Sequence, residues 1–421
     1  MIKKKIILGI TVISMALSLC SCGKEKQKDP EEKINIDSEN DSADNDNAIV
    51  LTPGENVLEN EQVLDKIDEI NGLIDYYFYF ETDVEAQEEA IYDGIMEGLG
   101  DPYSVYYTAE EFADLMESNS GEYVGIGAVV SQDASMVITI VRPIPNSPAE
   151  EVGLMAEDII VQVDELELTD EDINSVVEKI RGKEGTTAYI KVFRPSINDY
   201  LEFDVPRRVV ENYTVYTDKL ENDITYIQVQ GFDEKTFGEF KDAIDVAESD
   251  GTKGLIIDLR DNSGGLLDAV VDMCDYMMNG GTIVTTKDKN GVIISKHIAS
   301  TEHYVDMPIV VLINGNSASA SEIFAGAMKD TGMATLVGTN TFGKGIVQSV
   351  IPLEDGTAIK LTIAKYFTPN GNDIHQIGIA PDYEVELPDG RTNAVNIDRE
   401  DDTQLEKGIE LLEKKILNEA K

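Results

Sequence analysis

The hydrophobic and polar positions of this chain fall into two alternating patterns, which together predict an α/β protein of several domains. In the first pattern, apolar residues recur every three or four positions, as on one face of a helix. It runs through residues 63–77, 86–99 and 237–247, the last within a helix expected over residues 232–249. In the second pattern, apolar residues form short continuous runs, as in strands buried on both faces. The clearest such runs are residues 254–259 and 309–313.

Changes of pattern and composition divide the 421 residues into six expected segments. The linker among them is rich in Asp, Glu, Asn and Lys and has almost no large apolar residues, so we expect it to be extended and disordered. The six are an export signal (1–22), an acidic linker (23–56), a helical region (57–118), a small β-rich domain (119–207), a larger α/β domain (208–386) and a tail with an amphipathic helix (387–421).

The N-terminal segment has the layout of an export signal. Lysines at positions 3–5 precede an apolar run, residues 6–19, which is too short for a comfortable membrane span. The end of this segment resembles the cleavage box of bacterial lipoproteins, in which a small residue precedes the acylated cysteine. Cys22, which follows Ser21, fits that box better than Cys20 does. We therefore expect a lipid anchor on the extracytoplasmic face of the cell membrane; an uncleaved anchor or a plain secretory signal are the alternatives.

Charge and residue usage exclude several classes of protein. The net charge of −47, from 81 acidic and 34 basic residues, argues against nucleic-acid binding, which needs basic patches. One cysteine outside the signal, Cys274, cannot form an internal disulfide framework. The three histidines, His297, His303 and His375, have no metal-ligand spacing. We therefore expect no metal and no cofactor.

The helical region and the β-rich domain have recognisable boundaries. Thr108 and Glu111 form a capping-box pattern at the start of a short helix. The run DPYSVYYTAEEF, residues 101–112, which includes the start of this helix, is expected to serve packing or dimerisation rather than chemistry. In the β-rich domain we expect one helix over residues 170–179 and strands over residues 125–132, 137–141, 158–163 and 187–194.

The tail predicts a charged amphipathic helix over residues 402–421. Its apolar stripe consists of Leu405, Ile409, Leu412 and Ile416. The polar face carries as many acids as bases, which disfavours a helix that lies on a membrane surface. We expect it to pack against the rest of the chain or to form a homodimer.

Candidate chemistry gathers in residues 309–348. A β-branched run ends at a tight turn, residues 314–316, and a helical pattern starts within the serine cluster that follows. A helix N-terminus offers unpaired backbone N–H groups and a positive dipole end, where developing negative charge is stabilised. The serines are Ser317, Ser319 and Ser321. From the residues alone, each could be a nucleophile or a helix cap.

A lysine downstream is the candidate base. A serine hydroxyl is a weak nucleophile without one. Lys344 lies between two glycines, and Gln348 follows four residues later. A lysine pKa of roughly 10.4 must fall by about three units, roughly 4 kcal/mol, before the amine works near neutral pH. Burial is the natural cause, because Phe342 and Ile346 bring no carboxylate that would hold the charge. The Gln348 amide could orient the lysine without stabilising the cation strongly.

Three motifs in this order resemble those of the C-terminal processing, or tail-specific, proteases, the serine peptidases of family S41. From the N-terminus they are D-L-R-D-N-S-G-G at residues 258–265, S-A-S-A-S-E at residues 317–322, and the G-K-G turn at residues 343–345, in which Gln348 follows four residues after the lysine. The family places nucleophile and lysine 25 residues apart, which selects Ser319 (344 − 25 = 319). The resemblance implies a ClpP/crotonase-like α/β core in which Ser319 and Lys344 form the catalytic dyad, assisted by Gln348.

The same resemblance implies an oxyanion hole. The backbone N–H of Ala320, next to the nucleophile, would act with one N–H from the glycine turn, either Gly264 or, preferably, Gly265. Two positions depart from the family pattern: Ser263 replaces a more usual proline, and His375 replaces a glutamine. A base at position 375 is not needed beside a catalytic lysine.

The β-rich domain resembles a PDZ domain with the circularly permuted strand order of bacterial proteases. The matching segments are residues 123–127, 147–160 and 172–181, and residues 101–112 resemble the segment that precedes the PDZ domain in this protease family. PDZ domains add an extended peptide as a strand and seat its terminal carboxylate on backbone N–H groups. The resemblance assigns that cradle to Tyr123, Val124, Gly125, Ile126 and Gly127, whose glycines allow close backbone approach.

The sequence therefore predicts an exported serine endopeptidase that captures free C-termini of protein substrates and cleaves near them through an acyl-enzyme. One alternative is a PDZ adaptor lipoprotein with a silent peptidase scaffold, against which the intact Ser319, Lys344 and Gln348 argue. The other is acyl-CoA chemistry on the related crotonase-like architecture. The export signal disfavours it, because CoA is cytosolic.

Overall fold

The computed structural model describes residues 60–133, 135–168, 171–395 and 397–419. The predicted export signal, Cys22 and the acidic linker lie outside these residues. The described chain forms two units, one ending at Ile95 and one starting at Met96. The first contains α1 (Glu61–Tyr77) and most of α2 (Val84–Glu97), in agreement with the helical periodicity. No helix in the described ranges is long and apolar enough to span a membrane.

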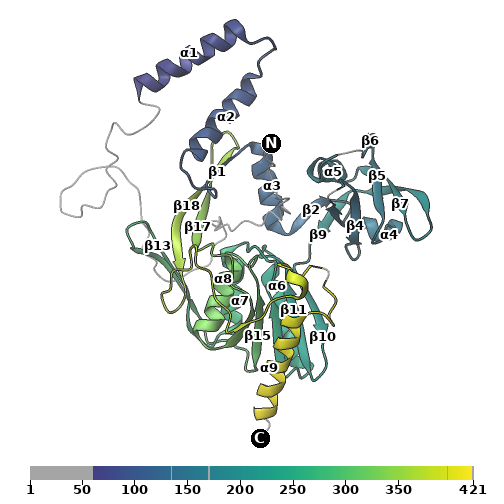
Figure 1. Cartoon of the computed structure of the whole chain (residues 1–421), viewed down its shortest axis with the longest axis vertical. Helices are drawn as coiled ribbons and strands as arrows, with labels where there is room; N and C mark the ends of the chain where they lie inside the picture. The colour runs from purple at the N-terminus through teal and green to yellow at the C-terminus, as the bar shows by residue number, and fades with distance from the viewer. Residues whose placement is uncertain (1–59, 134, 169–170, 396, 420–421) are drawn as a thin grey trace, which may run out of the picture. The chain divides into compact units, whose positions relative to one another are not determined.

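The second unit is built around a mostly parallel sheet, as the alternating pattern predicts for an α/β domain (Figure 1). β12 and β15 are buried at every residue, which explains their continuous apolar sequences. All neighbouring pairs are parallel except the first, which is antiparallel. In spatial order the strands are β10 (Val215–Lys219), β11 (Ile224–Val229), β12 (Gly254–Asp258), β15 (Ile309–Ile313), β16 (Ala334–Gly338) and β19 (Tyr383–Glu384).

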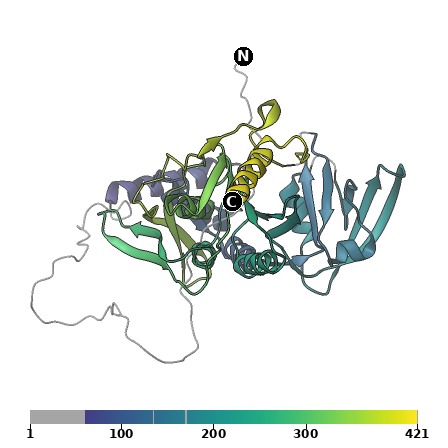
Figure 2. The same cartoon turned by 90° about the horizontal axis from the view of Figure 1, so that it is seen from below.

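Helices cover both faces of this sheet. Alternate residues of a strand point to opposite faces. Leu255 and Ile257 belong to the largest apolar core, with residues of α6, α7 and α8, whereas Ile256 belongs to a second core with α9. Figure 2 shows α9, in yellow, against the strands. The expected packing role of the tail helix is therefore confirmed. The helices are α6 (Thr236–Ser249), α7 (Leu267–Met277), α8 (Ala320–Asp330) and α9 (Thr403–Glu419).

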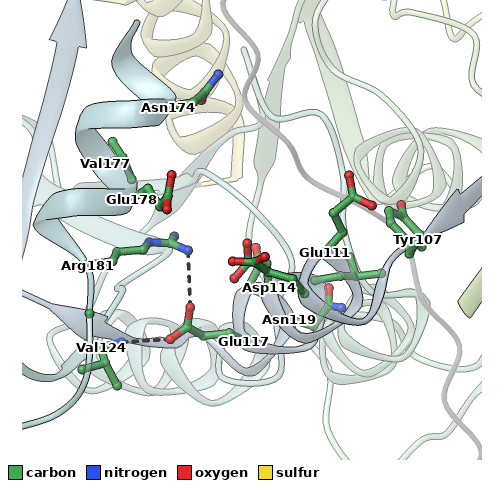
Figure 3. Close-up of a pocket in the computed structure, with 14 residues that line it drawn as sticks. Tyr107, Glu111, Asp114, Glu117, Asn119, Val124, Asn174, Val177, Glu178 and Arg181 are labelled. Atoms are coloured by element: carbon green, nitrogen blue, oxygen red, sulfur yellow. Dashed lines mark hydrogen bonds and ion pairs between the residues drawn. The ribbon is translucent and has the colours of Figure 1, made fainter. Parts of the chain in front are cut away.

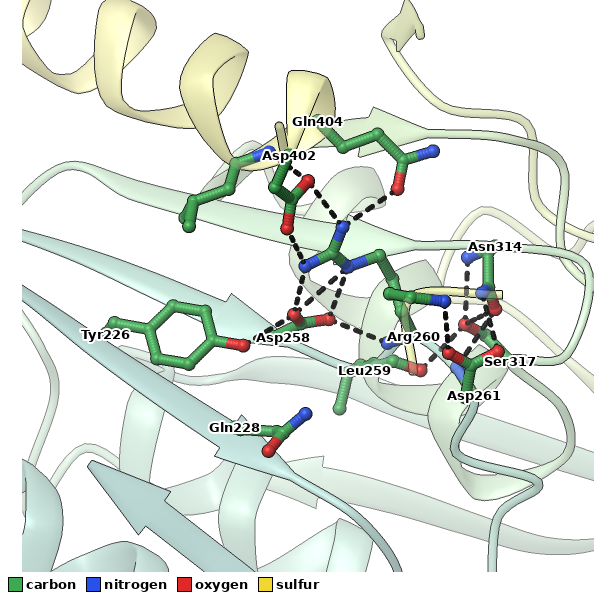
Figure 4. A network of polar contacts seen from close by, with 12 residues as sticks. Tyr226, Gln228, Asp258, Leu259, Arg260, Asp261, Asn314, Ser317, Asp402 and Gln404 are labelled. Atoms are coloured by element: carbon green, nitrogen blue, oxygen red, sulfur yellow. Dashed lines mark hydrogen bonds and ion pairs between the residues drawn. The ribbon is translucent and has the colours of Figure 1, made fainter. Parts of the chain in front are cut away.

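A buried polar network fixes the start of α9 to the end of β12 (Figure 4). The Arg260 guanidinium donates to Asp258 at 2.6 Å and to Asp402 at 2.8 Å. Gln404 accepts a further bond from Arg260 at 3.1 Å, and the Tyr226 hydroxyl donates to Asp258 at 2.7 Å. Because each buried charge has partners, the network holds the helix in one register. These contacts give Arg260 a structural role.

A second sheet contains β1 (Val105–Tyr107), a short strand that follows α2 in the sequence. β1 pairs antiparallel with β18, with Val105 opposite Lys360. Its three residues are too few to produce a recognisable pattern, so the sequence did not predict it. The other strands are β18 (Ala358–Phe367), β13 (Gly281–Lys287) and β14 (Ile293–Ala299), with β17 (Ile346–Pro352) also paired with β18.

The β-rich domain has its own sheet and its own apolar core. Its strands, in spatial order, are β3 (Ala128–Gln132), β4 (Ile138–Pro143), β5 (Ile159–Val163), β7 (Thr187–Arg194) and β8 (Asp199–Pro206); β6 (Leu166–Glu167) pairs with β5, and the helices are α4 (Pro148–Val152) and α5 (Ile173–Ile180). β3 is therefore an edge strand. The sequence did not predict β8.

Two expected boundaries were wrong. The single strand expected over residues 125–132 is two strands, because the chain turns at Gly127, where φ is +76°. The first part, β2 (Glu122–Gly125), pairs with β9 (Arg208–Glu211) instead of with the β-rich sheet. The helix expected from residue 232 begins at Thr236, because the Asp233 carboxylate accepts the N–H groups of Lys235 and Thr236. The capping box at the start of α3 (Ala109–Ser120) is confirmed.

Candidate active site

The topology brings the three motifs of the sequence to one edge of the parallel sheet. β12 leads into the glycine turn, β15 into the serine cluster and β16 into the loop that carries Lys344. Because these neighbouring strands are parallel, their carboxyl ends lie at the same edge. Ligands of open α/β sheets bind at such edges.

Ser319 occupies a strained backbone conformation immediately before α8. Its φ is +55° and its ψ is −113°, in a region that favours glycine. The residue is buried, with 3% of its surface exposed. Gly264 packs directly against it: a Cβ on Gly264 would lie 2.8 Å from the Cβ of Ser319 and 2.8 Å from the carbonyl oxygen of Ala318. A sharp strand-to-helix turn of this kind is typical of nucleophile elbows.

The hydroxyl groups of the three candidate serines have different surroundings. The Ser317 hydroxyl donates to the carbonyl of Leu259 at 2.7 Å, and the Ser321 hydroxyl donates to the carbonyl of Asn262 at 2.8 Å. The Ser319 hydroxyl donates to no acceptor among the described residues. Of the three, Ser319 is thus the serine whose proton is available to a base.

The carboxylate of Glu322 connects the serine turn to the lysine loop. It is fully buried and accepts four hydrogen bonds. Oε2 accepts the backbone N–H groups of Ser319 (2.9 Å) and Lys344 (2.8 Å). Oε1 accepts the Thr341 hydroxyl (2.6 Å) and the Gly343 N–H (2.7 Å). One oxygen therefore holds the backbones of both Ser319 and Lys344.

Tyr366, from β18, makes a second bridge between the same two residues. Its hydroxyl lies 3.0 Å from the carbonyl oxygen of Ser319 and also hydrogen-bonds the carbonyl oxygen of Lys344. The Tyr366 side chain is almost completely buried. Ser319 and Lys344 are thus fixed through both their N–H and their C=O groups.

The amine of Lys344 lies in a partly buried, largely apolar place. Burial lowers its pKa from the ordinary lysine value, and the carboxylates of Asp101 and Glu322 partly oppose that shift. Nζ lies 4.9 Å from the centre of the Tyr103 ring. The pKa is therefore shifted in the direction that a lysine base requires.

Gln348 lies on β17 and is almost fully buried. Its amide nitrogen donates to the carbonyl of Tyr103 at 2.5 Å. Its amide oxygen is buried and has no hydrogen-bond partner in the described part of the chain. Because Nε2 is fixed by Tyr103, the amide oxygen remains as an acceptor for an amine or a water molecule.

Backbone N–H groups near Ser319 meet the requirements of an oxyanion hole. The Gly264 N–H is engaged, because it donates to the Asn262 side chain at 2.9 Å. The Gly264 carbonyl accepts the Phe232 N–H, so the N–H of Gly265 points away from Phe232 across the same trans peptide. Within the described residues the N–H groups of Gly265 and Ala320 have no acceptor. These two groups, rather than the N–H of Gly264, are free to bind an oxyanion.

The expected carboxylate cradle borders a cleft of about 720 Å³, lined chiefly by α3 and α5 (Figure 3). The Val124 N–H donates to the Glu117 carboxylate at 3.0 Å, and Arg181 pairs with the other oxygen of Glu117 at 3.3 Å. The N–H groups of Ile126 and Gly127 have no acceptor in the described ranges. A side-chain carboxylate therefore already occupies part of this cradle. Ser319 does not line the cleft.

Sequence reasoning assigned no role to several residues of this site. Glu322 belonged to the serine motif without a function of its own, and Tyr366 had no local signal. Residues 101–107 were expected to serve packing, yet Tyr103 contacts both Lys344 and Gln348. The available signal was that this segment also resembled the family, although nothing in it indicated contact with the lysine.

One other cluster has metal-ligand atoms. Asp245, Glu248 and His303 each place one such atom within 4.8 Å of the others. Lys241 already pairs with Asp245 at 2.5 Å, and His303 lies 3.3 Å from Glu248. The Lys241 cation already lies beside the acidic groups of this cluster, and we assign no metal to it.

Comparisons with known proteins point to one family. Residues 223–385 match the model of peptidase family S41, and residues 139–194 match a PDZ domain. The chain is 38% identical over 317 residues to a carboxy-terminal-processing protease of Bartonella bacilliformis, covering 74% of this chain and 72% of that one. It is 37% identical over 328 residues to the carboxy-terminal processing protease CtpA of Bacillus subtilis, covering 77% and 69%. Among solved structures, the photosystem II D1 C-terminal processing protease is 28% identical, with a TM-score of 0.46 over 74% of this chain and 84% of that one.

Glu322→Gln tests the carboxylate bridge. A glutamine offers one oxygen and one NH₂ group, so in either orientation at least one of the backbone N–H groups of Ser319, Gly343 and Lys344 loses its acceptor. An unsatisfied buried donor costs about 1–3 kcal/mol. We expect hydrogen exchange of at least one of the Ser319, Gly343 and Lys344 amides to accelerate about tenfold or more, measured by mass spectrometry. The exposed Glu354→Gln is the matched control. Unchanged exchange at all three amides would contradict the role given to Glu322.

Proposed function

Because the chain belongs to the carboxy-terminal processing proteases of peptidase family S41 and carries a PDZ domain, we propose that Ser319 and Lys344 form its catalytic dyad. The observation that carries this proposal is the Glu322 bridge, in which one carboxylate oxygen accepts the backbone N–H groups of both Ser319 and Lys344. The pKa of the Lys344 amine is also lowered by burial, as a base requires. The free donor capacity of the Ser319 hydroxyl supports it further.

The proposed reaction is acyl transfer in two steps. Ser319 Oγ attacks the scissile carbonyl while its proton passes to the neutral amine of Lys344. The N–H groups of Gly265 and Ala320 hold the oxyanion. Collapse of the tetrahedral intermediate expels the amine product, which takes the proton back from Lys344. Water then attacks the acyl ester on Ser319 and gives a proton to Lys344. The Ser319 oxygen leaves and takes that proton back from Lys344, which releases the product with its new C-terminal carboxyl group and restores both residues. Gln348 Oε1 accepts a hydrogen bond from the Lys344 amine and orients it.

We further propose that the PDZ domain captures the free C-terminus of a protein substrate. β3 is an edge strand, to which an extended peptide can add. The N–H groups of Ile126 and Gly127 and the Arg181 guanidinium would receive the terminal carboxylate. Because Glu117 now pairs with Arg181 and Val124, the substrate carboxylate must displace a carboxylate of the same chain. Glu117 therefore competes with the substrate.

The proposed location is the extracytoplasmic face of the cell membrane, with Cys22 as the lipidated residue. Support comes from the lysines, apolar run and Ser21-Cys22 pair of the N-terminal sequence. The acidic linker would then hold the peptidase away from the anionic surface.

The dyad predicts a selective loss of cleavage. Ser319→Ala and Lys344→Ala should each lower kcat/KM on an unstructured protein by about 10⁴-fold or more, because nucleophile and base act as a unit. Ser317→Ala and Ser321→Ala remove only hydrogen bonds to backbone carbonyls and should retain cleavage. Loss of turnover in either of these, with full turnover by Ser319→Ala, would move the nucleophile to another serine.

Carboxylate capture predicts sensitivity to amidation of the substrate. Arg181→Met should raise KM for a substrate with a free C-terminus by about 10–100-fold and leave an amidated substrate almost unaffected, because a charged hydrogen bond is lost. Glu117→Ala should lower KM for the free C-terminus. Arg208→Met, at a surface ion pair with Glu151, is the control. An Arg181→Met variant that still discriminates between the two substrates as wild type does would rule out this cradle.

The anchor predicts that Cys22→Ser abolishes both incorporation of radiolabelled palmitate and sedimentation with the membrane fraction. Cys20→Ser should leave both unchanged. The reverse result would transfer the lipid to Cys20. If neither variant incorporates palmitate, the N-terminal segment is an export signal without lipidation.

A further inference from the structure

The turn formed by Asp101 and Tyr103 reaches the lysine from outside the matched peptidase range. The Asp101 carboxylate accepts the N–H of Tyr103 at 3.1 Å and the hydroxyl of Ser104 at 2.7 Å. The Ser104 hydroxyl in turn accepts the N–H of Thr362, on β18, at 3.1 Å. Pairing of β1 with β18 continues this attachment. The turn is therefore fixed to the sheet that flanks the lysine loop.

Tyr103 contacts the catalytic candidates with both its backbone and its ring. Its carbonyl accepts the Gln348 amide at 2.5 Å, and its ring centre lies 4.9 Å from Lys344 Nζ. The ring thus covers one side of the amine. A side chain in this position excludes water, and water is what would otherwise stabilise the ammonium form.

The charged groups around Lys344 come from several elements. Asp101 and Glu322 are carboxylates that favour its ammonium form. Lys360, on β18, is nearly buried, with Nζ 2.7 Å from the Tyr107 hydroxyl, and its cation opposes a second one on Lys344. The backbone of His375 packs on Gly345, the residue after Lys344. The hydroxyl of Tyr366 contacts the Lys344 carbonyl.

We propose that Asp101 and Tyr103 are positioning residues of the lysine base, which together set the pH at which Lys344 can accept a proton. The Tyr103 ring disfavours the ammonium form by excluding water, and the Asp101 carboxylate favours that form by its charge. This inference rests on the proposed function in so far as the amine of Lys344 is the base. On this account, the short segment that holds Asp101 and Tyr103 is a component of the active site.

The direction of each contribution follows from the surroundings. Burial alone would raise the pKa of Asp101, but the hydrogen bonds that it accepts hold this pKa below its usual value, so the carboxylate is charged at neutral pH. Removing that charge must lower the pKa of Lys344. Removing the Tyr103 ring has two effects: it admits water, which raises the pKa of Lys344, and it removes the attraction of the ring face for the cation, which lowers this pKa. Because burial is the main cause of the lowered pKa of Lys344, the first effect prevails. The two variants therefore move the same quantity in opposite directions, which a merely structural role would not do.

The test measures the Lys344 pKa directly in the full chain, purified in mild detergent. The rate at which acetic anhydride labels the Lys344 amine is followed against pH by peptide mass spectrometry, and the acid limb of kcat/KM is measured in parallel. We expect Tyr103→Ala to raise both midpoints by about one pH unit and Asp101→Asn to lower both by about one unit. Tyr103→Phe, which keeps the ring, should restore the wild-type midpoints. Tyr304→Ala and Asp306→Asn, at exposed positions, are the matched controls.

The outcomes separate this inference from the proposed function. Labelling midpoints that stay at the wild-type value in Tyr103→Ala and Asp101→Asn, or that move in the same direction in both, overturn the inference. Opposite shifts in labelling support it. If cleavage persists in Lys344→Ala, the dyad is wrong, while the labelling shifts still decide whether Asp101 and Tyr103 control the Lys344 amine.

Discussion

The buried carboxylate of Glu322 is the constraint on which the rest of the site depends. A carboxylate without water needs hydrogen-bond donors, and four of them converge on it from the serine turn and the lysine loop. This demand fixes two loops, which follow different strands, relative to one another. Because Glu322 already accepts these four hydrogen bonds, it does not need the Lys344 amine as a further donor. The nucleophile and the base are therefore positioned through their backbones, while their reactive side-chain atoms remain available.

The lysine poses the opposite electrostatic problem. It must be buried enough to lose its proton, yet Glu322 and Asp101 both favour its charged form. Burial, to which the Tyr103 ring contributes, shifts the balance toward the neutral amine, and the neutral Gln348 amide brings no charge that would oppose this shift. The pH at which the enzyme works then depends on the balance between the opposing effects of several groups on the Lys344 pKa. None of them is the base, and two of them come from a segment that precedes the PDZ domain.

The sequence predicted the fold class, the family and most strands and helices of the peptidase domain, because long apolar runs and repeated motifs carry those features. Ser317 and Ser321 could not be distinguished from Ser319 by residue type; the carbonyl groups that engage the two flanking serines distinguish them in the structure. The prediction of a single strand over residues 125–132 was wrong because the chain turns at Gly127, although the apolar pattern of the sequence continues through it. The contacts of Tyr103 and Tyr366 with the site join residues far apart in the chain, and local patterns contain no information about such contacts.

The central claim is that Ser319 is the nucleophile and that Lys344 activates it. The most direct measurement is acid quenching of the full chain during turnover of a peptide ester, followed by tandem mass spectrometry of the digested protein. The account predicts an acyl group on Ser319 that forms in the wild type and is absent after Lys344→Ala. An acyl group on Ser317 or Ser321, or one that forms on Ser319 at the same rate without Lys344, would contradict it.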